Sequence, residues 1–193
     1  MTIRKFMTID LIVLSVMALV VDIIGYYASK SALVFFYVSL SIPIMMIAYI
    51  RWGIKGISIN VLAILVYTVM YQNFDLVPML LYAVSILSVA LSMIWFKIVK
   101  KNHIKDEFLL LTLYYLTGYL SLFIIQAISQ MIISNEIQWI TLTARHSINF
   151  LLGWVILFIA SKQQDFMVDM KAYLLKSIQD RKKEGKFSDE ESL

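Results

Sequence analysis

Cysteine is absent from this chain, and proline and charged residues are scarce. Among 193 residues there are two prolines, and only 16% of the residues are charged. The lack of thiols excludes disulfides, zinc–thiolate sites and cysteine nucleophiles. Because 61% of the residues are hydrophobic and mean hydropathy is +0.80, a soluble domain of this size could not bury its apolar side chains. We therefore expect a multi-pass protein of the cell membrane.

Motifs for catalysis and for nucleotide binding are also missing. The glycine-spaced GIKG at Gly53–Gly56 is too short for a GxxxxGK[ST] phosphate loop. The two histidines, His103 and His146, are far apart and form no HExxH pair. The net charge of +4 comes from basic residues spread along loops and one tail. We therefore expect no enzyme, no cofactor, no metal site and no nucleic-acid partner.

Six apolar segments are long enough, or nearly so, to cross roughly 30 Å of hydrocarbon as helices. They are Ile9–Tyr27, Ala32–Ile50, Ile54–Tyr71, Leu76–Phe96, Phe108–Ser134 and Trp139–Ala160. The first resembles a secretory signal, but it contains Asp22 and is longer than most signal cores, so we expect no cleavage. Pro43 is expected to kink the second segment. The sequence therefore predicts an all-α integral membrane bundle of six transmembrane helices.

Charge predicts the orientation of these segments. Of 17 lysines and arginines, fifteen fall before the first segment, in alternate loops or after the sixth. Lys30 falls in a loop of the other set, and Arg145 lies inside the sixth segment. Because basic loops stay in the cytoplasm, the sequence predicts that both termini are cytoplasmic.

The composition changes after Ala160, which divides the chain into a membrane domain (1–161) and a tail (162–193). Apolar residues recur there at helical spacing, and they are Phe166, Met167, Met170, Tyr173, Leu174 and Ile178. We expect a cytoplasmic amphipathic helix on the inner leaflet, followed by a disordered RKKEGKFSDEESL. A solvated tail that only enforces topology, or a tail that binds a partner, fits the same residues.

Polar residues inside the apolar segments are the main functional candidates, because ionisable groups in hydrocarbon are costly. Counting 1.5 Å per residue, Asp22 and Arg145 lie roughly 8 and 9 Å below the outer ends of their segments. Helical spacing brings further polar and aromatic side chains to the same outer layer. The candidate site residues are Asp22, Tyr67, Tyr71, Tyr119, Gln126, Gln130, Arg145, His146 and Asn149.

Two interpretations of this polar layer remain open. In the first, Asp22 and Arg145 form a buried ion pair that fixes the first segment to the sixth, and the amides make interhelical hydrogen bonds. In the second, the same groups line an outward-facing pocket with aromatic walls that include Phe36. Such a pocket predicts a small, water-soluble ligand that is zwitterionic or heteroaromatic. By contrast, Ser85, Ser88 and Ser92 are expected to form a close-packing helix face.

The stretch SIPIMMIAYIRWGIKGISINVLAILVYTVMY at Ser41–Tyr71 resembles the substrate-binding S component of an energy-coupling-factor (ECF) vitamin transporter. The resemblance lies in the proline of the second helix, the glycine-spaced turn at Gly53 and Gly56, and the third helix. It implies capture of a vitamin from outside, together with an ECF transmembrane coupling subunit and two cytosolic ATPases as partners. The alternatives are a membrane scaffold of the bacterial rod-shape type, which has no small-molecule ligand, and a self-sufficient small transporter.

Overall fold

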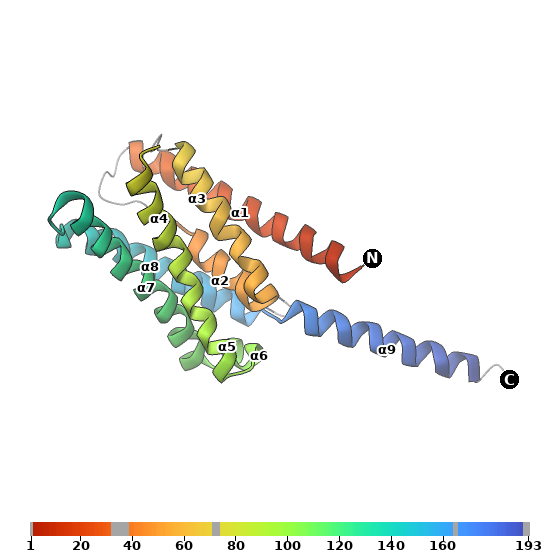
Figure 1. Ribbon diagram of the computed structural model, residues 1–193. Coiled ribbons are helices and arrows are strands. Elements are labelled where there is room, and N and C mark those ends of the chain that lie inside the picture. Colours follow the sequence, from red (N-terminus) through yellow and green to blue (C-terminus); the bar gives the residue numbers. More distant parts are fainter. Residues whose placement is uncertain (1, 32–38, 71–73, 164–165, 191–193) are drawn as a thin grey trace.

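A computed structural model describes residues 2–31, 39–70, 74–163 and 166–190 as a bundle of α-helices from which the last helix projects (Figure 1). Those residues contain no strand. The helices of the first half are α1 (Ile3–Ser31), α2 (Ser41–Trp52), the 3-10 helix η1 (Gly53–Ile57) and α3 (Ser58–Met70). Then come α4 (Leu76–Ser88), the 3-10 helix η2 (Val89–Ile94), α5 (Trp95–Ile98), α6 (Lys101–Asp106), α7 (Phe108–Ser134), α8 (Trp139–Lys162) and α9 (Met170–Glu190).

Five helices in the described part of the chain are long and apolar enough to cross a membrane. They are Ile3–Tyr27, Ser41–Met70, Leu76–Ile98, Phe108–Ser134 and Trp139–Lys162. The all-α prediction is confirmed, whereas the predicted six spans and their orientation are not. The difference arises in Ser41–Met70, which contains most of the second and third predicted segments.

Ser41–Met70 turns back on itself at Gly53. Gly53 has φ +60°, a conformation that favours glycine, and it ends α2. A Cβ on Gly56 would lie 2.8 Å from the carbonyl carbon and oxygen of Ala48, and the Tyr49 hydroxyl donates to Asn60 Oδ1 at 2.6 Å. In a continuous helix, eight residues would separate such groups by about 12 Å. The turn predicted at Gly53 and Gly56 is therefore present, and α2 and α3 are separate helices.

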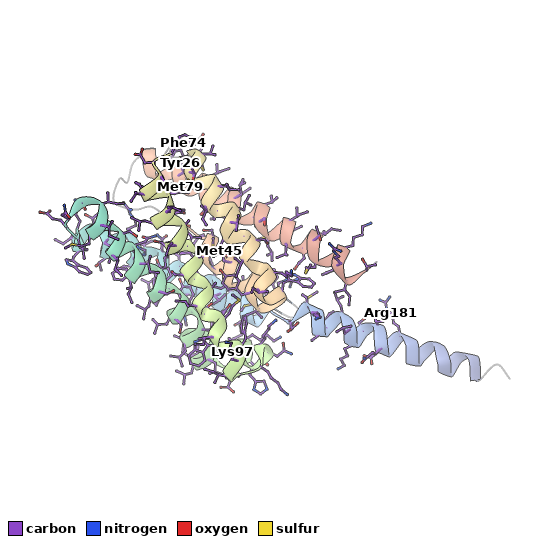
Figure 2. All side chains as sticks on the ribbon, in the orientation of Figure 1. Tyr26, Met45, Phe74, Met79, Lys97 and Arg181 are labelled. Carbon is purple, nitrogen blue, oxygen red and sulfur yellow. The ribbon has the colours of Figure 1, made fainter. Side chains whose placement is uncertain are left out.

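α2 forms the centre of the bundle. All twelve of its residues are buried, which fits a helix that is apolar on every side until Arg51. Met45, which Figure 2 labels in the middle of the bundle, is fully buried. Because α2 begins at Ser41, Pro43 lies in its first turn. Backbone N–H groups of the first turn have no acceptor within the helix, so a proline there costs no hydrogen bond. Pro43 therefore does not kink the interior of this helix as predicted.

The second half of the α4–η2–α5 rod packs closely on α7. A Cβ on Gly118 of α7 would lie 3.1 Å from the Val89 carbonyl oxygen, and the Ser121 hydroxyl donates to the Ser88 carbonyl at 2.8 Å. Ser85, Ser88 and Ser92 are all buried, as expected for a close-packing face. Small residues on both helices allow this approach of their backbones.

The basic connections, the N-terminal end of α1 and the start of α9 gather at one end of the bundle. Figure 1 shows the N-terminus, the η1 turn, α5 with α6, and the start of α9 at this end, and the α7–α8 connection at the other. In Figure 2, Tyr26, Phe74 and Met79 lie together, away from Lys97 and Arg181. We call these the basic end and the distal end.

α9 is longer than the sequence indicated. The prediction placed disorder from Arg181 onward, but the helix continues to Glu190 before the described residues end. Lysine, arginine and glutamate are good helix formers, and they allow the helix to extend although it leaves the bundle (Figure 1). The start of α9 is anchored, because Val168 and Met170 are buried in a small cluster with Trp52.

Candidate functional site

A cavity of about 450 Å³ lies between helices in the distal half of the bundle. It is bounded by the end of α3, most of α4, the second half of α7 and the first half of α8, together with Ile42 in the first turn of α2 and Ser39 just before it. Its polar and aromatic lining consists of Ser39, Tyr67, Tyr82, Ser85, Tyr119, Gln126, Ser129, Gln130, Arg145, His146 and Asn149. Its apolar lining consists of Ile42, Pro78, Leu81, Ile86, Leu122 and Ile133. The size falls within the range of sites for small molecules.

His146 joins α8 to α7 at one wall of the cavity. Its Nε2 lies 2.8 Å from Gln126 Oε1, and its Nδ1 lies 3.1 Å from the Tyr119 hydroxyl. Tyr119 and His146 are buried, and the two rings meet edge to face. The Gln126 oxygen can only accept, so Nε2 donates to it. The one proton of the Tyr119 hydroxyl is shared between Nδ1 and the His146 carbonyl oxygen, each 3.1 Å away.

Ser39 connects the cavity to Asp22. Its backbone N–H donates to Asn149 Oδ1 at 2.8 Å, and its hydroxyl donates to Asp22 Oδ1 at 2.8 Å. Asn149 in turn donates to the Arg145 carbonyl at 3.1 Å. Asp22 lies in a narrow crevice between α1 and α3 with Ala18 and other apolar residues, behind Ser39. Asp22 is thus a support for the cavity wall and does not line the cavity.

Arg145 lines the cavity with an exposed side chain. The ion pairs within the described ranges are Arg51–Asp10 and Lys101–Asp169, so Arg145 has no carboxylate partner there. The ion pair between Asp22 and Arg145, one of the two interpretations of the polar layer, does not form among the described residues. The physical reason is position, because Asp22 lies in the crevice between α1 and α3 while Arg145 lines the cavity.

Tyr67 and Tyr82 form an aromatic wall. Their rings are stacked with centroids 3.6 Å apart and planes 13° from parallel, which joins α3 to α4. A flat ligand ring entering the cavity would find the edges or an outer face of this pair.

Most of the sequence-predicted site residues meet at this cavity. Seven of them line it, namely Tyr67, Tyr119, Gln126, Gln130, Arg145, His146 and Asn149. Asp22 lies behind the wall, and Tyr71 and Phe36 lie outside the described residues. The contribution of α4 was missed, although Pro78, Leu81, Tyr82 and Ser85 recur at spacings of three, one and three residues. That helical stripe is visible in the sequence, where the spacing of Ser85 with Ser88 and Ser92 favours close packing over a ligand role.

A second polar cluster, at the basic end, was not predicted. The Arg51 guanidinium binds both carboxylate oxygens of Asp10 at 2.8 Å and donates to the Phe166 carbonyl at 2.5 Å. Trp52 Nε1 also donates to Asp10. This cluster ties α1, α2 and the segment before α9 together. The sequence signal for this cluster was Asp10, an acidic residue near the start of the first apolar segment. Its expected depth is close to that of Arg51, just before the turn at Gly53.

Metal chemistry finds no support in the described part of the chain, where no three histidine, aspartate or glutamate side chains could hold an ion together. The cavity therefore offers hydrogen bonds, one cation and aromatic surface, which are means of binding.

No family model, curated protein or solved structure matches this chain. Its function must be argued from its own residues.

Proposed function

We propose that this chain is the membrane-embedded, substrate-binding S component of an ECF-type transporter, which captures a small water-soluble vitamin or related micronutrient from outside. The observation that carries the proposal is the convergence of α3, α4, α7 and α8 on a cavity of about 450 Å³ rich in polar side chains. Polar groups facing a cavity inside apolar helices are expensive unless they serve a ligand or pathway. The chain binds its ligand and does not transform it.

The topology that this proposal needs is six spans with both termini in the cytoplasm. Two observations support it. The N-terminus, the η1 turn, α5, α6 and the start of α9 share the basic end (Figure 1). The cavity-lining residues belong to the distal halves of their helices. With the basic end inside, according to the positive-inside rule, the cavity would take its ligand from outside.

The energy for uptake would come from partners. No phosphate loop occurs in the sequence, so an ECF transmembrane coupling subunit and cytosolic ATPases would supply ATP hydrolysis. The basic end is where such partners would act, and the Arg51–Asp10 cluster would keep α1, α2 and the tail in one arrangement there.

A scaffold of the rod-shape type remains the second candidate, and one observation favours it. α9 projects from the bundle and keeps large apolar side chains exposed, including Tyr173, Leu175 and Ile178 (Figure 1). Such a helix could bind a partner protein, although it could also lie on the inner leaflet.

Thermal unfolding of the detergent-purified chain against a panel of vitamins and precursors separates these candidates. A ligand that binds only the folded state raises its stability by about 2.7 kcal/mol at a hundredfold excess over Kd. A shift from one compound supports the S component and names its cargo. No shift from any compound, with co-purification of cell-wall proteins, supports the scaffold.

A further inference from the structure

We propose that the ligand of this cavity is an anion, and that its carboxylate or equivalent group is held by Arg145. The inference rests on the proposed function, because it assumes that the cavity holds a small molecule. It narrows the ligand class suggested by the sequence, which had allowed a zwitterion recognised by Asp22 and Arg145 together.

The charge of the described lining is the first observation. Arg145 is its only permanently charged member, and no aspartate or glutamate lines the cavity. Asp22, the acidic residue that the sequence places in the same layer, lies in a separate crevice and accepts a hydrogen bond from the Ser39 hydroxyl. A cation on the ligand would find no counterion at this wall, whereas an anion would find one.

The hydrogen-bonding capacity left over is the second observation. The Gln130 oxygen already accepts the backbone N–H of Gln138 at 3.3 Å, and the Gln126 oxygen already accepts Nε2 of His146. In the part of the chain that the structure describes, no partner binds the amide nitrogens of these two glutamines. The N–H groups left uncommitted are therefore those of two amides and the guanidinium of Arg145.

A guanidinium together with two amide donors, and with no carboxylate in the described lining, favours an acceptor-rich ligand. Arginine binds a carboxylate through two parallel N–H···O bonds, which are charge-assisted and roughly twice as strong as neutral ones. A carboxamide of the same shape replaces one acceptor oxygen with an NH₂ donor and carries no charge. The NH₂ group of the carboxamide would face the N–H donors of Arg145, so we expect the cavity to bind the carboxamide much more weakly than the acid.

The rest of the ligand has an apolar and aromatic environment. Ile42, Leu122 and Ile133 line the cavity, together with the stacked pair of Tyr67 and Tyr82. The geometry thus points to a small organic acid with an apolar or ring-bearing body, rather than to a simple inorganic anion.

The test uses the full-length protein in detergent and matched pairs of acid and neutral analogue: nicotinate with nicotinamide, biotin with biotinamide, and pantothenate with panthenol, alongside the wider vitamin panel. Thermal shifts are measured for wild type, Arg145→Gln, Arg145→Lys and Arg181→Gln. Arg181 is the matched control, because it is an exposed arginine on α9, far from the cavity (Figure 2).

We expect the stabilising compound to be an acid, with its neutral analogue at least tenfold weaker. Arg145→Gln should weaken binding by at least tenfold, Arg145→Lys by less, and Arg181→Gln should not change it. If Arg145→Gln does not fold, the acid–neutral comparison on wild type and the Arg145→Lys variant decide the question.

Other outcomes distinguish the two levels of the proposal. A neutral or cationic compound that stabilises wild type and Arg145→Gln equally overturns the anion inference, while ligand capture itself stands. No shift from any acid or other compound overturns both.

Discussion

The Nε2 atom of His146 lies 2.8 Å from the Oε1 atom of Gln126, and this contact joins α8 to α7 beside the cavity. The same glutamine thus has two roles. Its oxygen accepts from the histidine ring, and its amide nitrogen is one of the donors that we propose for the ligand. Substitutions at Gln126 can separate these roles.

Gln126→Leu should remove both the contact with His146 and the amide donor. Gln126→Glu should remove only the amide donor. The leucine leaves His146 Nε2 without an acceptor, so we expect the free energy of unfolding to fall by about 1–2 kcal/mol and ligand binding to be lost. The glutamate keeps an acceptor oxygen, so stability should lie closer to wild type, while its negative charge weakens anion binding at least tenfold. Unfolding and thermal-shift measurements on both variants test this, with the exposed Gln179→Leu as control. Unchanged stability and affinity in Gln126→Leu would contradict it.

Asp22→Asn should leave ligand affinity within about threefold of wild type, since Asp22 lies behind Ser39 and asparagine keeps an acceptor oxygen for its hydroxyl. The measurement is the same ligand titration that is used for Arg145→Gln. A loss as large as that of Arg145→Gln would show that Asp22 meets the ligand directly and would restore a zwitterion as the ligand class.

Arg51→Ala should be among the most destabilising substitutions at the basic end. It leaves the Asp10 carboxylate partly buried without its cation, and breaking such a pair costs about 3 kcal/mol. Arg51→Lys keeps the charge but cannot make the bidentate contact with Asp10, so we expect the free energy of unfolding to fall by about 1 kcal/mol. Lys101→Ala is the matched control, because the Lys101–Asp169 pair is more exposed and should contribute less than about 1 kcal/mol. Chemical unfolding in mixed micelles measures all three, and equal losses for Arg51→Ala and Lys101→Ala would oppose the assignment.

Gly153→Ala should destabilise the protein through Tyr115. The new methyl group would collide with the Tyr115 hydroxyl, which donates to the Phe150 carbonyl at 2.9 Å. We expect a loss of about 1–3 kcal/mol. Adding Tyr115→Phe removes the colliding oxygen, so the double variant should be more stable than Gly153→Ala alone. A double-mutant cycle gives the coupling energy, and strictly additive losses would rule out this contact as the cause.

The absence of cysteine makes the six-span topology directly testable. Single cysteines at Thr2, His103 and Arg181 should react with a membrane-impermeant maleimide only after the cells are permeabilised. A cysteine at Glu136, in the α7–α8 connection, should react in intact cells. Five crossings would instead put Thr2 and Arg181 on opposite sides of the membrane.

The sequence by itself determined the helical class and identified seven of the seventeen residues that line the cavity. Both depend on local quantities, because apolar length indicates a helix that can span, and depth along a helix follows from a rise of 1.5 Å per residue. Tyr119, Gln126 and Arg145 could therefore be assigned to one layer before their contacts were known. The turn at Gly53 was likewise visible, since glycine tolerates the positive φ found there.

Only the tertiary structure decided which of these groups meet. Asp22 and Arg145 are expected at similar depth. Depth along a helix does not determine which neighbouring helix a side chain contacts. Ser39 hydrogen-bonds the Asp22 carboxylate, while Arg145 is left lining the cavity. The stacking of Tyr67 on Tyr82 and the pairing of Asp10 with Arg51 are likewise contacts between distant segments. They depend on how whole helices pack, which is a property of the assembled bundle and not of any single segment.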